Sequence, residues 1–195
     1  MTIREYTNAD EMGWVRCRVV SFLDCSYSND VKTEKETYLQ PALCLVAEEN
    51  SAIVGLIDAE IDSYDLACAG EERGAIIWNL AVLPEYRRQG VAKALWEELK
   101  ARLIKEGVRY CEVWTQEDEA ANCFYKAAGF AREDSQTWLR CHANAAGIEK
   151  MLSDEAQDGI FGVEELVFNA PVMRREELRP LCDRIDEVRL YSIHI

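Results

Sequence analysis

The stretch Ile76–Leu103 decides the fold: it runs IIWNLAV, then LPEYRRQGV, then AKALWEELKARL. The apolar run Ile76–Val82 is short enough for a buried strand. Pro84 ends that strand, because proline has no N–H group to offer a β-ladder. Apolar residues then recur at helical spacing, at Val91, Leu95, Leu99 and Leu103. The stretch therefore predicts a strand, a tight turn and a helix in succession.

The turn between the two elements, Arg87–Ala92, carries the first sign of chemistry. Gly90 has no β-carbon, so a ligand can come close to its backbone. The helix that follows points unpaired N–H groups and its positive dipole end at the same space, which suits an anion and above all a pyrophosphate. Arg87 and Arg88 add positive charge. The alternative is an ordinary connecting turn with two solvated arginines.

Two blocks of sequence resemble one known family. The pattern Arg87-x-x-Gly90-x-Ala92 resembles the acyl-CoA pyrophosphate motif of the GNAT acetyltransferases, which is Gln/Arg-x-x-Gly-x-Gly/Ala. The segment Glu119–Phe130, with Phe124-Tyr125-x-x-x-Gly129-Phe130, is similar to a second block of that family. The resemblance covers about Ile76–Phe130, and on it the chain is identified as a member of the GNAT superfamily.

This resemblance implies an α/β fold of the GNAT type and acetyl-CoA as co-substrate, with no metal. The mixed central sheet would have about six to seven strands and would splay between strands 76–82 and 109–115, with helices on its flanks. The pantetheine arm of acetyl-CoA would pair with backbone groups in the gap. The residues expected to bind acetyl-CoA are Leu80, Ala81, Val82, Arg87, Arg88, Gln89, Gly90, Val91, Ala92, Asn122 and Tyr125.

The resemblance also implies the reaction: an acetyl group passes directly to a primary amine in a ternary complex, without an acyl-enzyme. Tyr125 aligns with the family tyrosine that protonates the departing thiolate, and a phenol is a suitable acid for that step. The alternative for Tyr125 is a core aromatic residue. Glu112 is the first candidate for the base that deprotonates the amine, with Glu60 and Asp62 as further candidates. A mechanism with no protein base stays open.

The sequence departs from the family pattern at two places. Asp118 stands where the family carries an asparagine that often bonds the cofactor arm, and Asn122 could replace that contact. Trp78 and Asn79 stand where some relatives carry a glutamate or histidine base. These departures motivate an alternative function, a GNAT-fold module that senses acyl-CoA without transferring its acyl group. A third alternative, an ATP-binding protein, lacks the Gly-x-x-x-x-Gly-Lys-Ser/Thr loop.

Along the chain we expect further elements. Ser26–Val31 is expected to form one wall of the acceptor site, where Tyr27, Asn29 and Asp30 could touch substrate. The expected helices are Glu11–Leu23, Lys32–Gln40, Glu119–Ala128 and Arg174–Ile185, with a further short helix within 143–162. The expected strands are Thr2–Tyr6, a hairpin of Ala42–Glu48 and Ile53–Ile61, then Arg109–Thr115, Gln136–His142, Glu165–Phe168 and Glu187–Ile195. We expect a GNAT domain over 1–142 and, over 143–195, an elaboration that completes the sheet or serves as a dimer contact or lid.

Composition limits the alternatives. The 195 residues carry a formal charge of −14, which argues against nucleic acid as a partner and mildly favours cationic substrates. No long apolar run or secretory signal pattern is visible, so we expect no membrane span. The eight cysteines show no Cys-x-x-Cys pair, which indicates reduced thiols and a cytoplasmic protein. The expected partner is an amine on a small molecule or peptide, and a homodimer stays open.

Overall fold

The structure is a computed structural model that describes residues 1–67, 72–152 and 162–195. The strands are β1 (Thr2–Glu5), β2 (Ala42–Glu49), β3 (Ala52–Ile61), β4 (Gly74–Val82), β5 (Tyr110–Thr115), β6 (Ala131–Ala143), β7 (Val167–Pro171) and β8 (Cys182–His194). The helices include α1 (Glu11–Phe22), α2 (Val91–Lys105), α3 (Glu119–Ala127), α4 (Ala145–Met151) and α6 (Arg175–Leu178). Short 3₁₀ turns precede α1, α2, α6 and β8.

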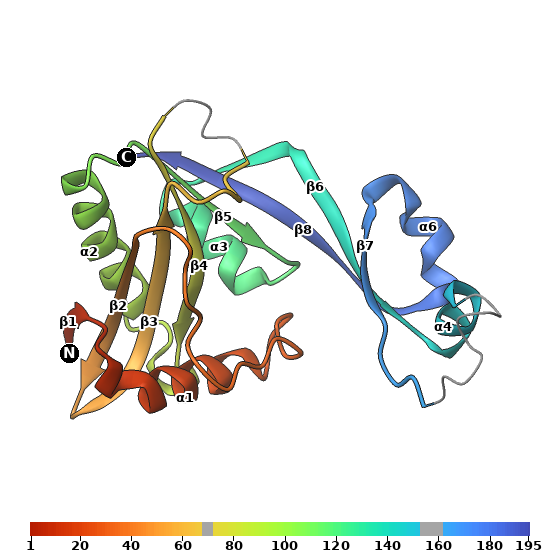
Figure 1. Cartoon of the computed structure of the whole chain (residues 1–195), viewed down its shortest axis with the longest axis horizontal. Helices are drawn as coiled ribbons and strands as arrows, with labels where there is room; N and C mark the ends of the chain where they lie inside the picture. The colour runs from red at the N-terminus through yellow and green to blue at the C-terminus, as the bar shows by residue number, and fades with distance from the viewer. Residues whose placement is uncertain (68–71, 153–161) are drawn as a thin grey trace.

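One mixed sheet runs through the described part of the chain in the order β1-β2-β3-β4-β5-β8-β6-β7 (Figure 1). The pair β4 and β5 is parallel, and the other neighbours are antiparallel. The predicted α/β class and the GNAT-type mixed sheet with flanking helices are confirmed, with eight strands in place of six or seven. The last strand, β8, lies between β5 and β6, so both of these strands pair with a strand that is distant in sequence.

The hairpin of β2 and β3 follows from local turn chemistry. Asn50 and Ser51 both have positive φ values, 50° and 62°, as a two-residue turn of the type favoured between twisted strands requires. Because side chains alternate along a strand, Gly55 and Asp58 of β3 lie on opposite faces of the sheet. Gly55 faces α2, and the Asp58 face is covered by α1 and the chain that follows it. We call the latter the α1 face.

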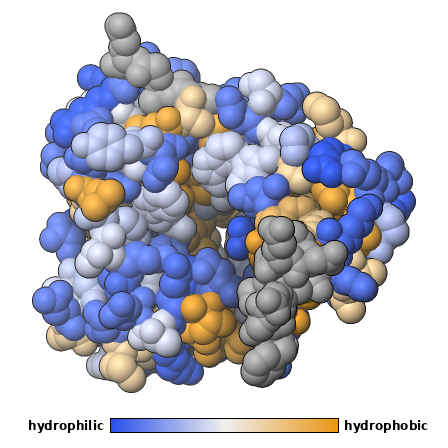
Figure 2. Space-filling view, turned by 45° about the vertical axis from the view of Figure 1, so that its right-hand side comes forward, coloured by the Kyte–Doolittle hydropathy of each residue, from blue (hydrophilic) through white to orange (hydrophobic). Residues whose placement is uncertain are grey.

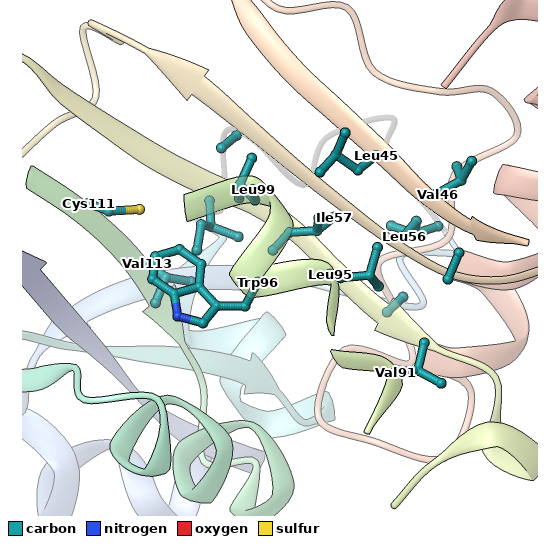
Figure 3. Packing of buried hydrophobic residues seen from close by; sticks show 14 of the residues in the cluster. Leu45, Val46, Leu56, Ile57, Val91, Leu95, Trp96, Leu99, Cys111 and Val113 are labelled. Atoms are coloured by element: carbon teal, nitrogen blue, oxygen red, sulfur yellow. The ribbon is translucent and has the colours of Figure 1, made fainter. Parts of the chain in front are cut away.

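The α2 face holds the main core. Leu95, Leu99 and Leu103 of α2 are fully buried, and Trp96 is 2% exposed. Figure 3 shows Leu95 and Trp96 packed among buried side chains of β2, β3 and β5. Burial of these apolar side chains is the main term that stabilises the fold. The same packing fixes the position of the start of α2 relative to β3 and β4.

The contact between β3 and α2 is close enough to predict a stability effect. A Cβ added at Gly55 would lie 2.9 Å from Val91 Cγ1, 3.1 Å from Leu95 Cδ1 and 3.3 Å from the carbonyl oxygen of Ala81. Gly55→Ala should therefore lower the free energy of unfolding by about 1–3 kcal/mol, measured by urea denaturation. Gly90→Ala is the control: it meets no atom within 4 Å and adds only the strain of a positive φ, about 1 kcal/mol. Equal stability of the two variants would contradict the close packing.

A smaller unit extends from the main body (Figure 1). We call it the distal lobe: β7, α4, α6 and the adjoining ends of β6 and β8. It has its own small core, made of Leu139, Cys141, Ala170, Leu178 and Cys182. The long antiparallel pair of β6 and β8 joins this lobe to the body, with a register shift between Glu133 and Thr137 of β6. Figure 2 shows a hollow between the body and the lobe.

The predicted helix Lys32–Gln40 is wrong: the segment is irregular in the structure. Its backbone N–H groups are used by side chains far away in the sequence. The N–H of Lys35 donates to Glu11 Oε1 at 2.9 Å, and that of Gln40 donates to Glu60 Oε1 at 2.8 Å. These tertiary hydrogen bonds replace the bonds that a helix would make, so local polarity misled the prediction.

The predicted helix Arg174–Ile185 is also too long. Its helical part is α6 with a 3₁₀ turn on either side, and the second turn contains Pro180, which cannot donate to a continuing helix. The final strand starts at Cys182 instead of Glu187. Residues 68–71, which include Cys68, and residues 153–161, within the 143–162 stretch that was predicted to contain a short helix, lie outside the described residues. Among the described helices, none is long and apolar enough to cross a membrane.

Candidate active site

The parallel strands β4 and β5 separate part-way along their length. Their pairing runs from Gly74 opposite Tyr110 to Ile77 opposite Val113 and then stops. β5 continues to pair with β8 up to Thr115, so only its β4 side opens. The register between β4 and β3 shifts at the same level, between Asp58 and Ala59 of β3, which makes Trp78 the extra residue of a bulge. Leu80, Ala81 and Val82, predicted to bind the cofactor arm, all lie beyond that bulge along the opening.

The N-terminus of α2 follows directly from the open end of β4. Gly90 is its N-cap residue, with φ 85°, and a Cβ there would meet no atom within 4 Å. The first N–H groups of the helix, from Val91 and Ala92, have no carbonyl one turn earlier to accept from them. Arg88 also has a positive φ, 60°, and its side chain is exposed. The turn is thus built to leave backbone donors facing open space.

Arg87 and Gln89 make internal contacts. The Arg87 guanidinium donates to the carbonyl oxygen of Ser21 at 2.7 Å and to that of Val82 at 3.2 Å, which ties the end of α1 to the end of β4. Gln89 donates to the carbonyl oxygen of Glu85 at 2.7 Å. These internal hydrogen bonds hold the Arg87 side chain in place. Of the two arginines that were predicted to bind pyrophosphate, the exposed Arg88 is therefore the better candidate for contact with a ligand.

Tyr125 of α3 lies on the α2 side of β5 and is 4% exposed. Its ring packs edge-on against Phe130 at 5.2 Å and stacks on Tyr191 at 6.4 Å between centroids. Burial raises the pKa of the Tyr125 phenol well above 10, so the group stays protonated at any physiological pH. A buried phenol that keeps its proton can serve as an acid, and it also fits the alternative of a core aromatic residue.

The departure at Asp118 has a structural reason. Its carboxylate accepts a hydrogen bond from the N–H of Ala121 at 2.8 Å and so caps the N-terminus of α3. The predicted substitute, Asn122, is 7% exposed and fully engaged. Its amide donates to the carbonyl oxygens of Gln116 and Asp118, and its oxygen accepts from the Thr115 hydroxyl. The pair holds α3 against the end of β5.

The loop after α1 crosses the opening on the α1 face. At one side, Asp30 accepts bonds from the Arg18 guanidinium to both its carbonyl oxygen and its carboxylate, at 2.6 and 2.7 Å. At the other side, the Tyr27 hydroxyl accepts a hydrogen bond from the N–H of Gln116 at 2.9 Å, just beyond β5. Asn29 is exposed between them. The segment that was predicted to form a wall of the acceptor site thus lies next to the opening.

Arg18 is a site residue that the sequence analysis did not single out. It is 2% exposed, and its Nε donates to Asn79 Oδ1 at 2.7 Å, just beyond the bulge in β4. Asn79 in turn donates to Glu36 Oε2 at 2.7 Å. A charged residue one turn after Trp14 on the buried side of a helix was the available signal. The network fixes the bulge and the loop together.

The carboxylates named as candidate bases lie on the α1 face, apart from Asp62. Glu112 is fully buried and accepts a hydrogen bond from the N–H of Ala67 at 2.7 Å. Glu60 is 4% exposed and accepts from Gln40 and from the indole N–H of Trp78 at 3.0 Å. Burial opposes ionisation of Glu60, but these hydrogen bonds hold its pKa below the usual value. Asp62 is exposed at the end of β3 and pairs with Arg73.

Comparison with known proteins decides the family. A model of the acetyltransferase (GNAT) domain matches residues 40–132. An acetyltransferase of Yersinia pestis (strain Pestoides F) is 30% identical over 107 residues, which are 54% of this chain and 70% of that relative. This chain belongs to the GNAT acetyltransferase family. As a GNAT protein it is an acetyltransferase, and the resemblance carried by Arg87–Ala92 and Glu119–Phe130 is confirmed.

A more distant relative and two solved structures are also acetyltransferases. An L-2,4-diaminobutyric acid acetyltransferase of Marinococcus halophilus is 28% identical over 126 residues, 64% of each chain. The PaiA N-acetyltransferase of Thermoplasma acidophilum, solved with coenzyme A, has a TM-score of 0.55 at 19% identity and covers 69% of this chain and 92% of its own. The ribosomal-protein-alanine N-acetyltransferase of Brucella melitensis has a TM-score of 0.58 at 12% identity over the whole of both chains.

Proposed function

We propose that this GNAT protein transfers an acetyl group from acetyl-CoA to a primary amine by direct attack in a ternary complex. The observation that carries the proposal is the opening between β4 and β5, which starts after Ile77 and Val113 and ends at the N-terminus of α2. Unpaired strand backbone can take an extended ligand as an added strand. The N–H groups after Gly90 suit a pyrophosphate.

The residues divide the binding of acetyl-CoA between them. The backbone of Leu80, Ala81 and Val82 would hold the pantetheine arm, and the turn Arg87–Ala92 would hold the pyrophosphate. Arg88 adds positive charge there, whereas Arg87 keeps the turn in place through Ser21. Acetyl-CoA supplies the acetyl group as a reactive thioester. Asn122 and Tyr125 would contribute through α3, Asn122 by holding the helix in position.

Two proton transfers complete the reaction. As the amine nitrogen bonds to the acetyl carbon and the carbon–sulfur bond breaks, the nitrogen loses a proton and the sulfur gains one. Tyr125 would donate the proton to sulfur, because burial keeps its phenol protonated. Glu112 would take the proton from the amine, since it lies opposite Ile76 in the paired part of β4 and β5, one residue before their last pair. Preorganised groups of this kind act mainly by stabilising developing charge.

The test is calorimetric titration with acetyl-CoA, followed by a thiol-release assay over a panel of amines. Saturable binding with amine-dependent thiol release is the expected result. Binding of acetyl-CoA without thiol release from any amine would instead support the acyl-CoA sensor. Absence of binding would contradict the role of the opening and of the turn Arg87–Ala92.

We also propose that the protein acts in the cytoplasm. The seven cysteines among the described residues are all free thiols, as a reducing compartment favours.

The distal lobe, which follows the predicted 1–142 GNAT domain, is proposed as a further wall of the acceptor site. It contacts the loop after α1 through Arg184, whose guanidinium donates to the carbonyl oxygen of Ser26 at 2.6 Å. Size-exclusion chromatography would separate this role from that of a homodimer contact.

A further inference from the structure

The α1 face carries buried carboxyl groups at the point where β4 and β5 separate. Asp58 and Glu112 are fully buried, and Glu60 is 4% exposed. The strand register places Glu60 and Glu112 on either side of Ile76 in one row across the sheet, with Asp58 two residues from Glu60 on the same face. Burial raises the pKa of Asp58, whereas hydrogen bonds hold the pKa of Glu60 below its usual value. Glu60 is therefore the carboxylate that favours a further cation nearby.

The same face already holds one alkylammonium group. Lys35 Nζ lies 3.2 Å from Asp58 Oδ2 and 4.6 Å from the centroid of the Tyr38 ring. The Tyr38 hydroxyl donates to the same carboxylate at 3.0 Å. The other oxygen, Asp58 Oδ1, is buried and accepts no hydrogen bond from a described residue. The arrangement shows which chemistry this face accommodates.

Trp78 adds an exposed aromatic surface beside these carboxylates. It is the bulge residue at the start of the opening and is 41% exposed. Its indole N–H donates to Glu60 Oε2 at 3.0 Å, which fixes the orientation of the ring. An indole held at its edge by a carboxylate can attract a cation through its π-face and through the negative charge beside the ring.

We propose that the acceptor is an alkyl diamine, an amine with a second positive charge that rests against Trp78 and Glu60 while its other end reaches the opening. Trp78 and Leu80 are two residues apart, roughly 7 Å along a strand, which a short alkyl chain spans. An acceptor with a carboxylate at its far end would meet Glu60 and be repelled. This inference rests on the proposed acetyl transfer and adds the class of acceptor.

The test compares three acceptors with the same four-carbon chain: putrescine, n-butylamine and γ-aminobutyrate. Putrescine should give the highest kcat/KM, about tenfold or more above n-butylamine, and γ-aminobutyrate the lowest. If n-butylamine or γ-aminobutyrate is acetylated as efficiently as putrescine, the inference is overturned and the transferase stands. If acetyl-CoA binds but putrescine neither reacts nor binds in calorimetry with coenzyme A present, the inference is overturned as well. Failure of acetyl-CoA to bind would instead contradict the proposed function.

Two variants locate the cation site. Trp78→Leu and Glu60→Gln should each reduce the preference of putrescine over n-butylamine by about three- to tenfold, mainly through a higher KM for putrescine. Glu97→Gln, an exposed position on α2, removes the same charge elsewhere and should leave the preference unchanged. A fall in kcat for all amines alike in Glu60→Gln, with the preference for putrescine unchanged, would overturn the site, because Glu60 would then act as the base. An unchanged preference in both variants would overturn the site as well.

Discussion

Replacing Gly90 by glutamate should weaken acetyl-CoA binding by about hundredfold, measured by calorimetric titration. Gly90 is the N-cap residue of α2, and the space around its missing Cβ is empty within 4 Å. A carboxylate placed there would compete for the N–H groups of the first helical turn and repel the phosphates. The effect is expected in binding, because a Cβ at this position meets no atom of the described residues within 4 Å.

Gly90→Gln is the matched control, since it has the same shape and the same backbone strain at φ 85° without the charge. It should weaken binding by about tenfold or less, because it adds bulk without a charge that repels the phosphates, and its backbone strain is the same in the free and the bound protein. Equal affinities of the two variants would mean that the phosphates lie elsewhere. Arg87 is a poorer position for this test, because its substitution would also release the carbonyl oxygens of Ser21 and Val82.

The central unit of the fold could be predicted from sequence because its signals are local. The apolar run, Pro84 and the helical spacing after Gly90 place β4 and α2 close to where the structure has them. The hairpin turn at Asn50 and Ser51 is local in the same sense. Asp118 also carried a local signal, because an aspartate just before a helix is a common N-cap, and here it accepts from the N–H of Ala121. The family pattern had suggested instead that a contact to the cofactor arm was missing at this position.

The acceptor side could not be predicted because its contacts join distant parts of the chain. The segment with Lys35 has the composition of a helix, yet Glu11 and Glu60 take its backbone donors. The position of β8 between β5 and β6 depends on pairings between residues far apart in the sequence, such as Ala131 and Ser192. Arg18 bonds Asn79, sixty-one positions away, at 2.7 Å. Patterns of polarity do not reveal which distant side chain will satisfy a given donor.

Tyr125→Phe should lower kcat by about hundredfold or more while leaving the affinity for acetyl-CoA nearly unchanged. The ring keeps its contacts with Phe130 and Tyr191, so the fold should persist, which thermal unfolding would verify. Tyr191→Phe is the control: it removes a hydroxyl from the ring stacked on Tyr125 and should change kcat little, because that hydroxyl has no assigned part in the proton transfer.

The pH dependence sharpens the prediction for Tyr125. Burial favours the neutral phenol, so the pKa lies well above 10 and the acid form persists through the range in which the enzyme can be assayed. Up to about pH 10, kcat of the wild type should therefore show no alkaline decrease that depends on Tyr125. The pH profiles of wild type and Tyr125→Phe should have the same shape over this range. Near-normal turnover in Tyr125→Phe would show that the thiolate takes its proton from solvent, and Tyr125 would then be a core residue.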